Sequence, residues 1–310
     1  MKIALTIRSF GGGDSEARRL LKETGWQVWE NLTGRHLDQE ALLAAVREAD
    51  GVVAGTEKFN GEVLKAGAGR LRVISRVGVG IDNIDPVAAR ELGIQVRNTP
   101  RAPAQAVAEH TLALMLAVSR RFKEHLLNMQ AGHFKAMSGH LVGGKTLGIV
   151  GLGTIGQLVA QMGQALGLHI LFFDPYLKGG EVEECLECVP SLGELFARAD
   201  IITLHASPAK EAHGMISREV LEQAKPGLIF INTARGNLVD EEALLHFLDE
   251  GRVLGAGLDV FHHEPYAGPL ARHPRVIATP HVASNTVESR QAMELEAVQN
   301  LLEVLRAQGG

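Results

Sequence analysis

Residues 146–156 read TLGIVGLGTIG. A short apolar run, TLGIV, leads directly into a loop of the pattern G-x-G-x-x-G, with its glycines at Gly151, Gly153 and Gly156. A segment of helix length follows at residues 155–166. The pattern predicts a strand, a tight turn and a helix whose first backbone N–H groups and dipole converge on a pyrophosphate. The stretch therefore indicates a dinucleotide-binding loop.

The next apolar run, HILFF at residues 169–173, ends directly before Asp174. An acid about 20 residues beyond the last glycine of such a loop accepts hydrogen bonds from the adenosine ribose. A carboxylate there would repel the 2′-phosphate of NADP, and residues 175–177 contain no Arg that could bind one. The sequence therefore predicts NAD rather than NADP. The alternative is a tight turn followed by a surface Asp, which would not require the complete order of strand, loop, helix, strand and acid.

Apolar runs of strand length alternate with stretches of helix length along the whole chain. The runs lie at residues 2–7, 51–55, 72–76, 146–150, 169–173, 200–204, 227–231 and 255–260. This alternation is typical of βαβ units and predicts an α/β fold with two doubly wound parallel sheets. We expect a Rossmann nucleotide domain at residues 99–283, inserted into a flavodoxin-like substrate domain formed by residues 1–98 and 284–310. The chemistry would take place in the crevice between them.

The longest helical stretch is expected at residues 102–129. One of its faces carries Leu112, Met115, Leu116, Ser119, Phe122 and Leu126. Such a face would be buried in the core, bridge the domains or form a dimer interface. Glu109 and His110 lie inside this helix, where we expect them to serve packing or an interface. Shorter helices have clear start signals, such as Asp85 before a proline and Asp240 before two acidic residues.

The composition excludes several classes of protein. The chain has 310 residues with 31 Lys and Arg against 36 Asp and Glu, a formal net charge of −5, so it offers no strong positive field for nucleic acid. No apolar run reaches the roughly 18 residues of a membrane-spanning helix, and the run of apolar residues after the first Lys is too short for a signal peptide. We therefore expect a cytoplasmic protein that binds neither nucleic acid nor membrane. Cys185 and Cys188 form a C-x-x-C among acidic residues without a second pair, so we expect no metal site.

Polar residues that could take part in catalysis follow three apolar runs in the second half of the chain. Arg235 follows GLIFI, Glu264 follows GLDVF, and His281 follows RVIA. Parallel sheets gather ligands at the carboxyl ends of their strands. An Arg guanidinium can bind a carboxylate and polarise an adjacent carbonyl, and a His held by a Glu can move the hydroxyl proton. Hydride transfer to NAD requires both functions. Taken singly, the three residues could also be a structural ion pair, a loop carboxylate and a half-buried histidine.

Seven motifs occur together along the chain. They are SRVGVGIDNID (75–85), NTP (98–100), AVAEHTLALML (106–116), GKTLGIVGLGTIG (144–156), INTARGNLVDEEAL (231–244), GLDVFHHEP (257–265) and TPH (279–281). With them the chain resembles the D-2-hydroxyacid dehydrogenase family, and within it the D-3-phosphoglycerate dehydrogenase branch. The resemblance implies that Arg235, Glu264 and His281 are catalytic.

The resemblance also implies binding residues. Backbone N–H groups of Val79 and Gly80 would bind the substrate carboxylate, and Gly78 and Gly80 let the backbone form an anion-binding nest. Arg76 would bind a substrate phosphate. The implied NAD contacts are Gly151, Gly153, Thr154, Ile155, Gly156, Asp174, Ala206, Thr233 and Asp259.

Two departures from the family pattern concern the ligands. Where relatives have H-x-P and then an apolar residue, this chain reads HASP at residues 205–208, which predicts a differently shaped loop beside the adenosine. Ala54 replaces an Arg that binds the substrate phosphate in phosphoglycerate dehydrogenases, whereas Arg76 is present. The resemblance favours D-3-phosphoglycerate and phosphohydroxypyruvate as the substrate pair, and hence serine biosynthesis. Hydroxypyruvate and glyoxylate remain alternatives.

The resemblance also implies what this protein would assemble with. It implies a homodimer formed through the nucleotide domain. It also leaves open an NADH-sensing corepressor, a binding module that keeps the fold without turnover. The chain carries no added basic segment of the kind such a protein would use.

Overall fold

The computed structural model describes residues 1–12, 15–177, 186–206 and 212–307. The chain divides into two compact units. Unit 1 comprises Met1–Pro103 and Asn285–Gly310, and unit 2 comprises Ala104–Ser284. Each unit is built on one sheet whose paired strands are all parallel, which confirms the α/β fold expected from the alternating pattern.

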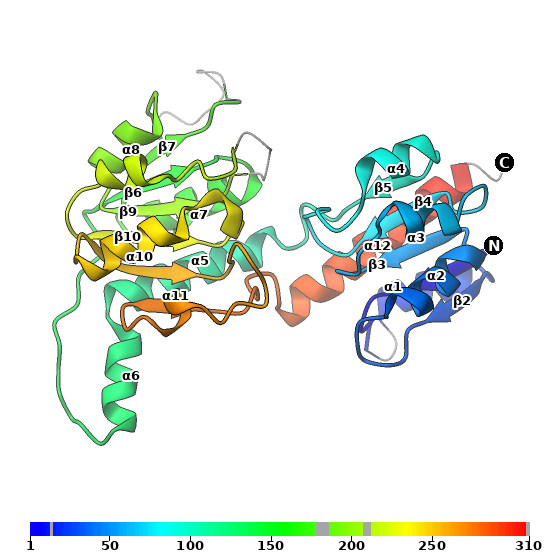
Figure 1. Cartoon of the computed structure of the whole chain (residues 1–310), viewed down its shortest axis with the longest axis horizontal. Coiled ribbons are helices and arrows are strands. Elements are labelled where there is room, and N and C mark those ends of the chain that lie inside the picture. Colours follow the sequence, from blue (N-terminus) through cyan, green and yellow to red (C-terminus); the bar gives the residue numbers. More distant parts are fainter. Residues whose placement is uncertain (13–14, 178–185, 207–211, 308–310) are drawn as a thin grey trace. The chain divides into compact units, whose positions relative to one another are not determined.

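The sheet of unit 1 has the order β2-β1-β3-β4-β5 (Figure 1). Its strands are β1 (Lys2–Leu5), β2 (Gln27–Glu30), β3 (Gly51–Ala54), β4 (Val73–Arg76) and β5 (Gln95–Arg97). This is the flavodoxin-like order of a doubly wound sheet. Because all of these strand pairs are parallel, the loops that follow the strands lie at one edge of the sheet, and the strand order reverses between β1 and β3.

Helices cover both faces of this sheet. They are α1 (Glu16–Glu23), α2 (Gln39–Glu48), α3 (Gly61–Ala66), α4 (Pro86–Glu91) and α12 (Val287–Ala307). Successive side chains of a strand point to opposite faces, so Ile3 and Leu5 pack with α1 and α12 while Ala4 packs with α2 and α3. The Asp85 carboxylate caps α4 by accepting hydrogen bonds from the backbone N–H groups of Val87 and Ala88, as the sequence predicts.

The sheet of unit 2 has the order β12-β11-β10-β9-β6-β7-β8. Its strands are β6 (Thr146–Val150), β7 (His169–Phe173), β8 (Glu187–Cys188), β9 (Ile201–Leu204), β10 (Leu228–Asn232), β11 (Val253–Leu258) and β12 (Val276–Ala278). With β6 as first strand this is the Rossmann order, extended by β12. The order reverses between β6 and β9, so the carboxyl end of β6 lies at the switch point where such folds bind ligands.

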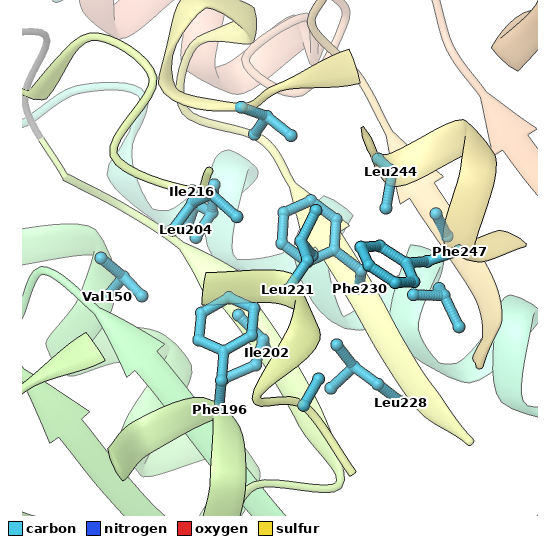
Figure 2. Close-up of a cluster of buried hydrophobic side chains, with 14 of the residues drawn as sticks. Val150, Phe196, Ile202, Leu204, Ile216, Leu221, Leu228, Phe230, Leu244 and Phe247 are labelled. Atoms are coloured by element: carbon cyan, nitrogen blue, oxygen red, sulfur yellow. The ribbon is translucent and has the colours of Figure 1, made fainter. Parts of the chain in front are cut away.

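Helices cover both faces of this sheet as well. They are α5 (Ala104–Ser119), α7 (Thr154–Ala165), α8 (Leu192–Arg198), α9 (Arg218–Glu222), α10 (Glu241–Asp249) and α11 (Pro269–Arg272). A further helix of this unit, α6 (Phe122–Gln130), buries none of its residues. Figure 2 shows the cluster on one face, in which Phe196, Phe230 and Phe247 pack with Leu221 and Leu244. On the other face α5 and α7 pack against the sheet. No helix in the described part of the chain has both the length and the apolar character needed to cross a membrane.

The prediction of a single long helix at residues 102–129 is wrong. The chain forms α5 and then α6, with a break at Arg121, whose backbone is left-handed with φ of 55°. The carbonyl of Ser119 accepts a hydrogen bond from the N–H of His140 instead of continuing the helical ladder. The expected apolar face is accordingly split. Met115 is buried, whereas Phe122 is exposed.

Candidate active site

The loop after β6 is too tight for any side chain at two of its glycines. Gly151 has φ of 89°, and a Cβ there would lie 2.8 Å from the backbone N of Ala206. A Cβ at Gly156 would overlap the carbonyl oxygen of Gly151. The loop therefore packs directly against the end of β9 on one side and against α7 on the other. Glycine at these positions is a steric requirement.

The N-terminus of α7 faces open space. Gly153 is the N-cap of this 12-residue helix, and no side chain caps it. A Cβ built at Gly153 would meet no atom within 4 Å. The first backbone N–H groups of α7, those of Thr154 and Ile155 among them, have no acceptor within the helix. The N–H donors at the start of α7, the dipole of this helix and the open space before it are together suited to binding a pyrophosphate.

Asp174 lies beside this loop. Its Oδ2 accepts a hydrogen bond from the backbone N–H of Leu152 at 2.9 Å, and its Oδ1 accepts one from the N–H of Tyr176 at 2.9 Å. The residue is half-buried at the end of β7. An ionised carboxylate has about four acceptor sites, so both oxygens can still accept a hydrogen bond from a ribose hydroxyl.

Three neighbouring strands of unit 2 end side by side. Asn232 of β10 pairs with Leu258 of β11, which pairs with Ala278 of β12. The residues that follow these strands are Thr233, Asp259 and Thr279. The parallel register thus brings three polar residues, distant in sequence, to one edge of the sheet.

The carboxylate of Asp259 is fully buried and closes the turn after β12. It accepts hydrogen bonds from the Thr279 hydroxyl at 2.6 Å and from the backbone N–H groups of Val282 and Ala283 at 2.9 and 2.8 Å. The carbonyl of Asp259 accepts a further one from the N–H of His281. His281 is held in the left-handed region at φ of 53°, which non-glycine residues rarely adopt.

The imidazole of His281 contacts Glu264, as the sequence motifs imply. Its Nδ1 lies 2.8 Å from Glu264 Oε2, and both side chains are partly exposed, by 47% and 37%. The other oxygen of Glu264 accepts a hydrogen bond from the backbone N–H of Phe261, whose ring stacks on Tyr266. With Nδ1 bound to the carboxylate, Nε2 is the ring nitrogen available to exchange a proton with a ligand.

Arg235 lies on the loop after β10, half-buried. The side chain of Asn232 shapes this loop, because it donates to the carbonyl of Arg235 and accepts from the N–H of Ala234. A Cβ at Gly236 would overlap the backbone of Phe261. The Arg235 loop therefore packs directly against the loop that carries Glu264. Loops with all three expected catalytic residues thus leave adjacent strands of unit 2.

The expected carboxylate-binding loop lies in unit 1, after β4. The Thr99 hydroxyl accepts a hydrogen bond from the N–H of Gly78 at 2.7 Å, and the Asn98 amide donates to the carbonyl of Val79 at 2.6 Å. Gly78 has φ of 134°, and the Arg76 guanidinium lies where its Cβ would be. The NTP motif therefore fixes the loop of Val79 and Gly80, with Arg76 beside it.

Some functional candidates were missed or fall outside the described residues. His110, for which the sequence predicts packing or an interface, and Thr111, for which it predicts no role of its own, reach the strand ends of unit 2: His110 Nε2 lies 3.2 Å from Thr279 Oγ1, and Thr111 Oγ1 lies 2.8 Å from Thr233 Oγ1. Their neighbours in sequence give no signal for these contacts. Cys185 and residues 207–208 lie outside the described residues, so the C-x-x-C and the altered loop have no complete geometry here. Within the described ranges no group of three or more His, Cys, Asp or Glu could hold a metal ion.

Comparisons with known proteins agree with this geometry. A family model described as the NAD-binding domain of D-isomer-specific 2-hydroxyacid dehydrogenases matches residues 112–283. D-3-phosphoglycerate dehydrogenase of Mycobacterium leprae is 42% identical over 257 residues, 82% of this chain and 48% of that protein. Hydroxypyruvate reductase of Thermotoga maritima is 37% identical over 299 residues, 94% and 95% of the two chains. The crystal structure of the TT0316 protein from Thermus thermophilus has a TM-score of 0.88 at 37% identity, covering 99% and 97%.

The lengths of these relatives differ. The chain spans about half the length of the mycobacterial phosphoglycerate dehydrogenases that it matches, since 48% of each is covered. It covers nearly the full length of the hydroxypyruvate reductase.

Beside the glycine loop, burial lowers the pKa of His205 to about 3 from its usual value of 6.5. Between these values the unfolded chain binds a proton that the folded chain does not, so the free energy of unfolding falls as the pH falls below 6.5. We expect His205→Asn to reduce this pH dependence by up to about 1.4 kcal/mol per pH unit. Urea unfolding between about pH 7 and pH 4.5 measures it, with His169→Asn at an exposed position as control. An unchanged slope in His205→Asn would contradict the assignment.

Proposed function

The chain belongs to the D-isomer-specific 2-hydroxyacid dehydrogenase family, and on that premise we propose that it interconverts a D-2-hydroxy acid and its 2-oxo acid with NAD. The observation that carries the proposal is the His281–Glu264 pair at 2.8 Å, on strand ends of the same unit that holds the open N-terminus of α7. A proton-transfer group and a pyrophosphate cradle are the two parts that such a reaction requires.

The dinucleotide would lie along the carboxyl edge of the unit 2 sheet. Gly151, Gly153 and Gly156 make room for the pyrophosphate, and the N–H groups of Thr154 and Ile155 would donate to it. Asp174 would accept hydrogen bonds from the ribose hydroxyls. Ala206, Thr233 and Asp259, which follow β9, β10 and β11, complete the predicted contacts. NAD, when bound, accepts the hydride from C2 of the hydroxy acid or supplies it to the oxo acid.

We assign the proton transfer to His281. In the reductive direction the imidazolium gives the proton on Nε2 to the oxygen at C2, and in the oxidative direction neutral imidazole takes it back. Glu264 accepts the hydrogen bond of Nδ1, which fixes the orientation of the ring. Each turnover therefore moves one proton through Nε2 while the hydrogen bond at Nδ1 is kept.

Arg235 and the unit 1 loop would bind the acid itself. The Arg235 guanidinium carries a fixed positive charge with several donors, which suits the substrate carboxylate and polarises the adjacent carbonyl. For the unit 1 loop that Asn98 and Thr99 fix, the family resemblance supports binding of a substrate carboxylate by the backbone N–H groups of Val79 and Gly80.

Two substrate pairs are the leading candidates, and glyoxylate remains an alternative substrate. D-3-Phosphoglycerate and phosphohydroxypyruvate are favoured by the relatives with 42% identity, and Arg76 would bind the phosphate. D-Glycerate and hydroxypyruvate are favoured by two observations. Ala54, buried in register with Arg76, leaves the phosphate with one Arg fewer, and the relative of matching length is a hydroxypyruvate reductase.

A panel of 2-oxo acids with NADH tests the proposal. We expect steady oxidation of NADH with phosphohydroxypyruvate or hydroxypyruvate, and the ratio of their kcat/KM values decides between the two pairs. His281→Ala should lower kcat in both directions by about 10²- to 10⁴-fold, the contribution of a general acid–base. Absence of turnover with every 2-oxo acid, while NADH still binds, would overturn the proposal in favour of a sensory binding module.

Cofactor choice should depend on Asp174. Its carboxylate accepts ribose hydroxyls and repels a 2′-phosphate, so Asp174→Ala should reduce the preference for NADH over NADPH. The kcat/KM ratio for the two cofactors measures this preference. Glu194→Ala, at a partly exposed position on α8, serves as the control. If the ratio is the same in wild type and Asp174→Ala, Asp174 does not select the cofactor.

A homodimer through unit 2 is supported by an apolar surface on α6. In Figure 1 this helix extends away from the sheet of its unit, and the segment after it runs back toward the sheet. Phe122, Leu126, Leu127 and Met129 are exposed by 50% to 58%, and Phe134 by 95%. Large apolar side chains gathered on one projecting element are typical of an interface. In a two-fold symmetric dimer the same surface of each subunit faces the other. The apolar surface of α6 in one copy would therefore pack against the same surface of a second copy of this chain.

Charge on this surface should prevent dimer formation. We expect wild type to sediment as a dimer and the double variant Leu126→Glu/Leu127→Glu to sediment as a folded monomer, since buried glutamates in an apolar interface would lose their hydration. Analytical ultracentrifugation measures the mass. Gln130→Glu adds a charge at an exposed position of the same helix and should remain dimeric. A monomeric wild type, or a double variant that stays dimeric, would refute this interface.

A further inference from the structure

Helix α5 contacts the ends of the strands that carry the expected catalytic residues. It packs against β10, β11 and β12, and two consecutive side chains make polar contacts there. His110 Nε2 lies 3.2 Å from the hydroxyl of Thr279, which follows β12, and Thr111 Oγ1 lies 2.8 Å from the hydroxyl of Thr233, which follows β10. We propose that His110 and Thr279 are positioning residues that act through Asp259 to hold His281 in its working orientation.

The hydrogen bonds around Thr279 have one consistent direction. Asp259 Oδ1 is an acceptor in a fully buried carboxylate, so the single hydroxyl proton of Thr279 is donated to it at 2.6 Å. The Thr279 oxygen can then only accept from His110, which places a proton on Nε2 of that imidazole. His110 Nε2 also lies 3.6 Å from Asp259 Oδ1. The resulting chain runs from His110 to Thr279 to Asp259.

The hydrogen bond between Thr111 and Thr233 also has one consistent direction. Thr111 donates its hydroxyl proton to the carbonyl of Val107 at 2.8 Å, one turn back in α5, so Thr233 must donate to Thr111. Helix α5 thus accepts a hydrogen bond from the β10 end and donates one to the β12 end. Both contacts lie within unit 2, and both are buried or half-buried.

Asp259 passes this constraint to His281. Its carboxylate binds the N–H groups of Val282 and Ala283, and its carbonyl binds the N–H of His281. These bonds close a turn in which His281 adopts a left-handed backbone, a conformation that persists only where the surroundings impose it. The Thr279 hydroxyl is one of three donors to the carboxylate. Without it a buried charged oxygen loses a partner, and the turn is free to shift.

The proposal rests on the proposed role of His281 and predicts a loss of rate without a loss of binding. Thr279→Val keeps the shape of the side chain and removes the hydroxyl, while Thr279→Ser keeps the hydroxyl. We expect Thr279→Val to lower kcat by about 10- to 100-fold, since a displacement of about 1 Å at a reacting group can cost 10²-fold. Thr279→Ser should retain most of kcat. The Kd for NADH, from quenching of nicotinamide fluorescence, should stay within about twofold in both variants.

His110 has its own matched pair. The side-chain amide of Gln can place an N–H near the position of Nε2, whereas Leu fills similar space without a donor. His110→Gln should therefore retain more of kcat than His110→Leu. Equal loss in both variants would remove the His110 hydrogen bond from the proposal.

A double variant separates positioning of His281 from a general effect on the fold. If Thr279 acts through His281, Thr279→Val should cause no further loss of kcat in a His281→Ala background. A further loss of about 10- to 100-fold there would overturn the proposal while leaving the catalytic role of His281 intact. If instead His281→Ala itself has full activity, the proposed function is what fails.

An NMR experiment tests the proposed positioning of His281 without a measurement of turnover. The imidazole Cε1–H resonance of His281, assigned by its absence in His281→Ala, should shift in Thr279→Val and remain near the wild-type position in Thr279→Ser. Identical spectra in wild type and Thr279→Val would overturn the proposal, whatever the enzyme is found to act upon.

Discussion

The arrangement of unit 2 depends on one buried carboxylate, that of Asp259. It lies at the end of β11 between two strands whose following loops carry the other polar residues, and it accepts hydrogen bonds from Thr279, Val282 and Ala283. Leaving a buried charge unpaired would be costly, so the chain after β12 must fold back to supply these donors. That fold places His281 in a strained backbone conformation with its ring against Glu264. The need to compensate this buried charge would therefore produce the geometry that we propose for catalysis.

We propose separate chemical tasks for the two units. Unit 2 holds the glycine loop, the acid at the end of β7 and the imidazole–carboxylate pair, so hydride and proton transfer would be served from one rigid sheet edge. Unit 1 presents the loop of Val79 and Gly80, fixed by Asn98 and Thr99. That loop leaves the carboxyl end of a parallel strand too, because a doubly wound sheet gathers its functional loops at this edge.

Much of this architecture can be predicted from the sequence, and the failures have physical causes. Buried parallel strands are continuous apolar runs, so the sequence predicts β6 and β7 with the same bounds that the structure shows. The break between α5 and α6 escapes prediction, since the apolar period continues across Arg121 while the backbone does not. The contact of His110 with Thr279 spans 169 residues, and no local pattern encodes it. The positions of Glu264 and His281 after apolar runs suggest that the two side chains could meet, and the resemblance to a known family turns this into a definite expectation.

On the proposed function, NADH bound at the strand ends of unit 2 would give a hydride to C2 of the 2-oxo acid, and His281 would give a proton to the oxygen of the same carbonyl group. Reduction of hydroxypyruvate with NADH deuterated at C4 on the transferred face tests it most directly, with mass spectrometry and chiral chromatography of the product. The expected product is D-glycerate with deuterium at C2 and at no other position. Unlabelled glycerate, or label in the L-isomer, would contradict it.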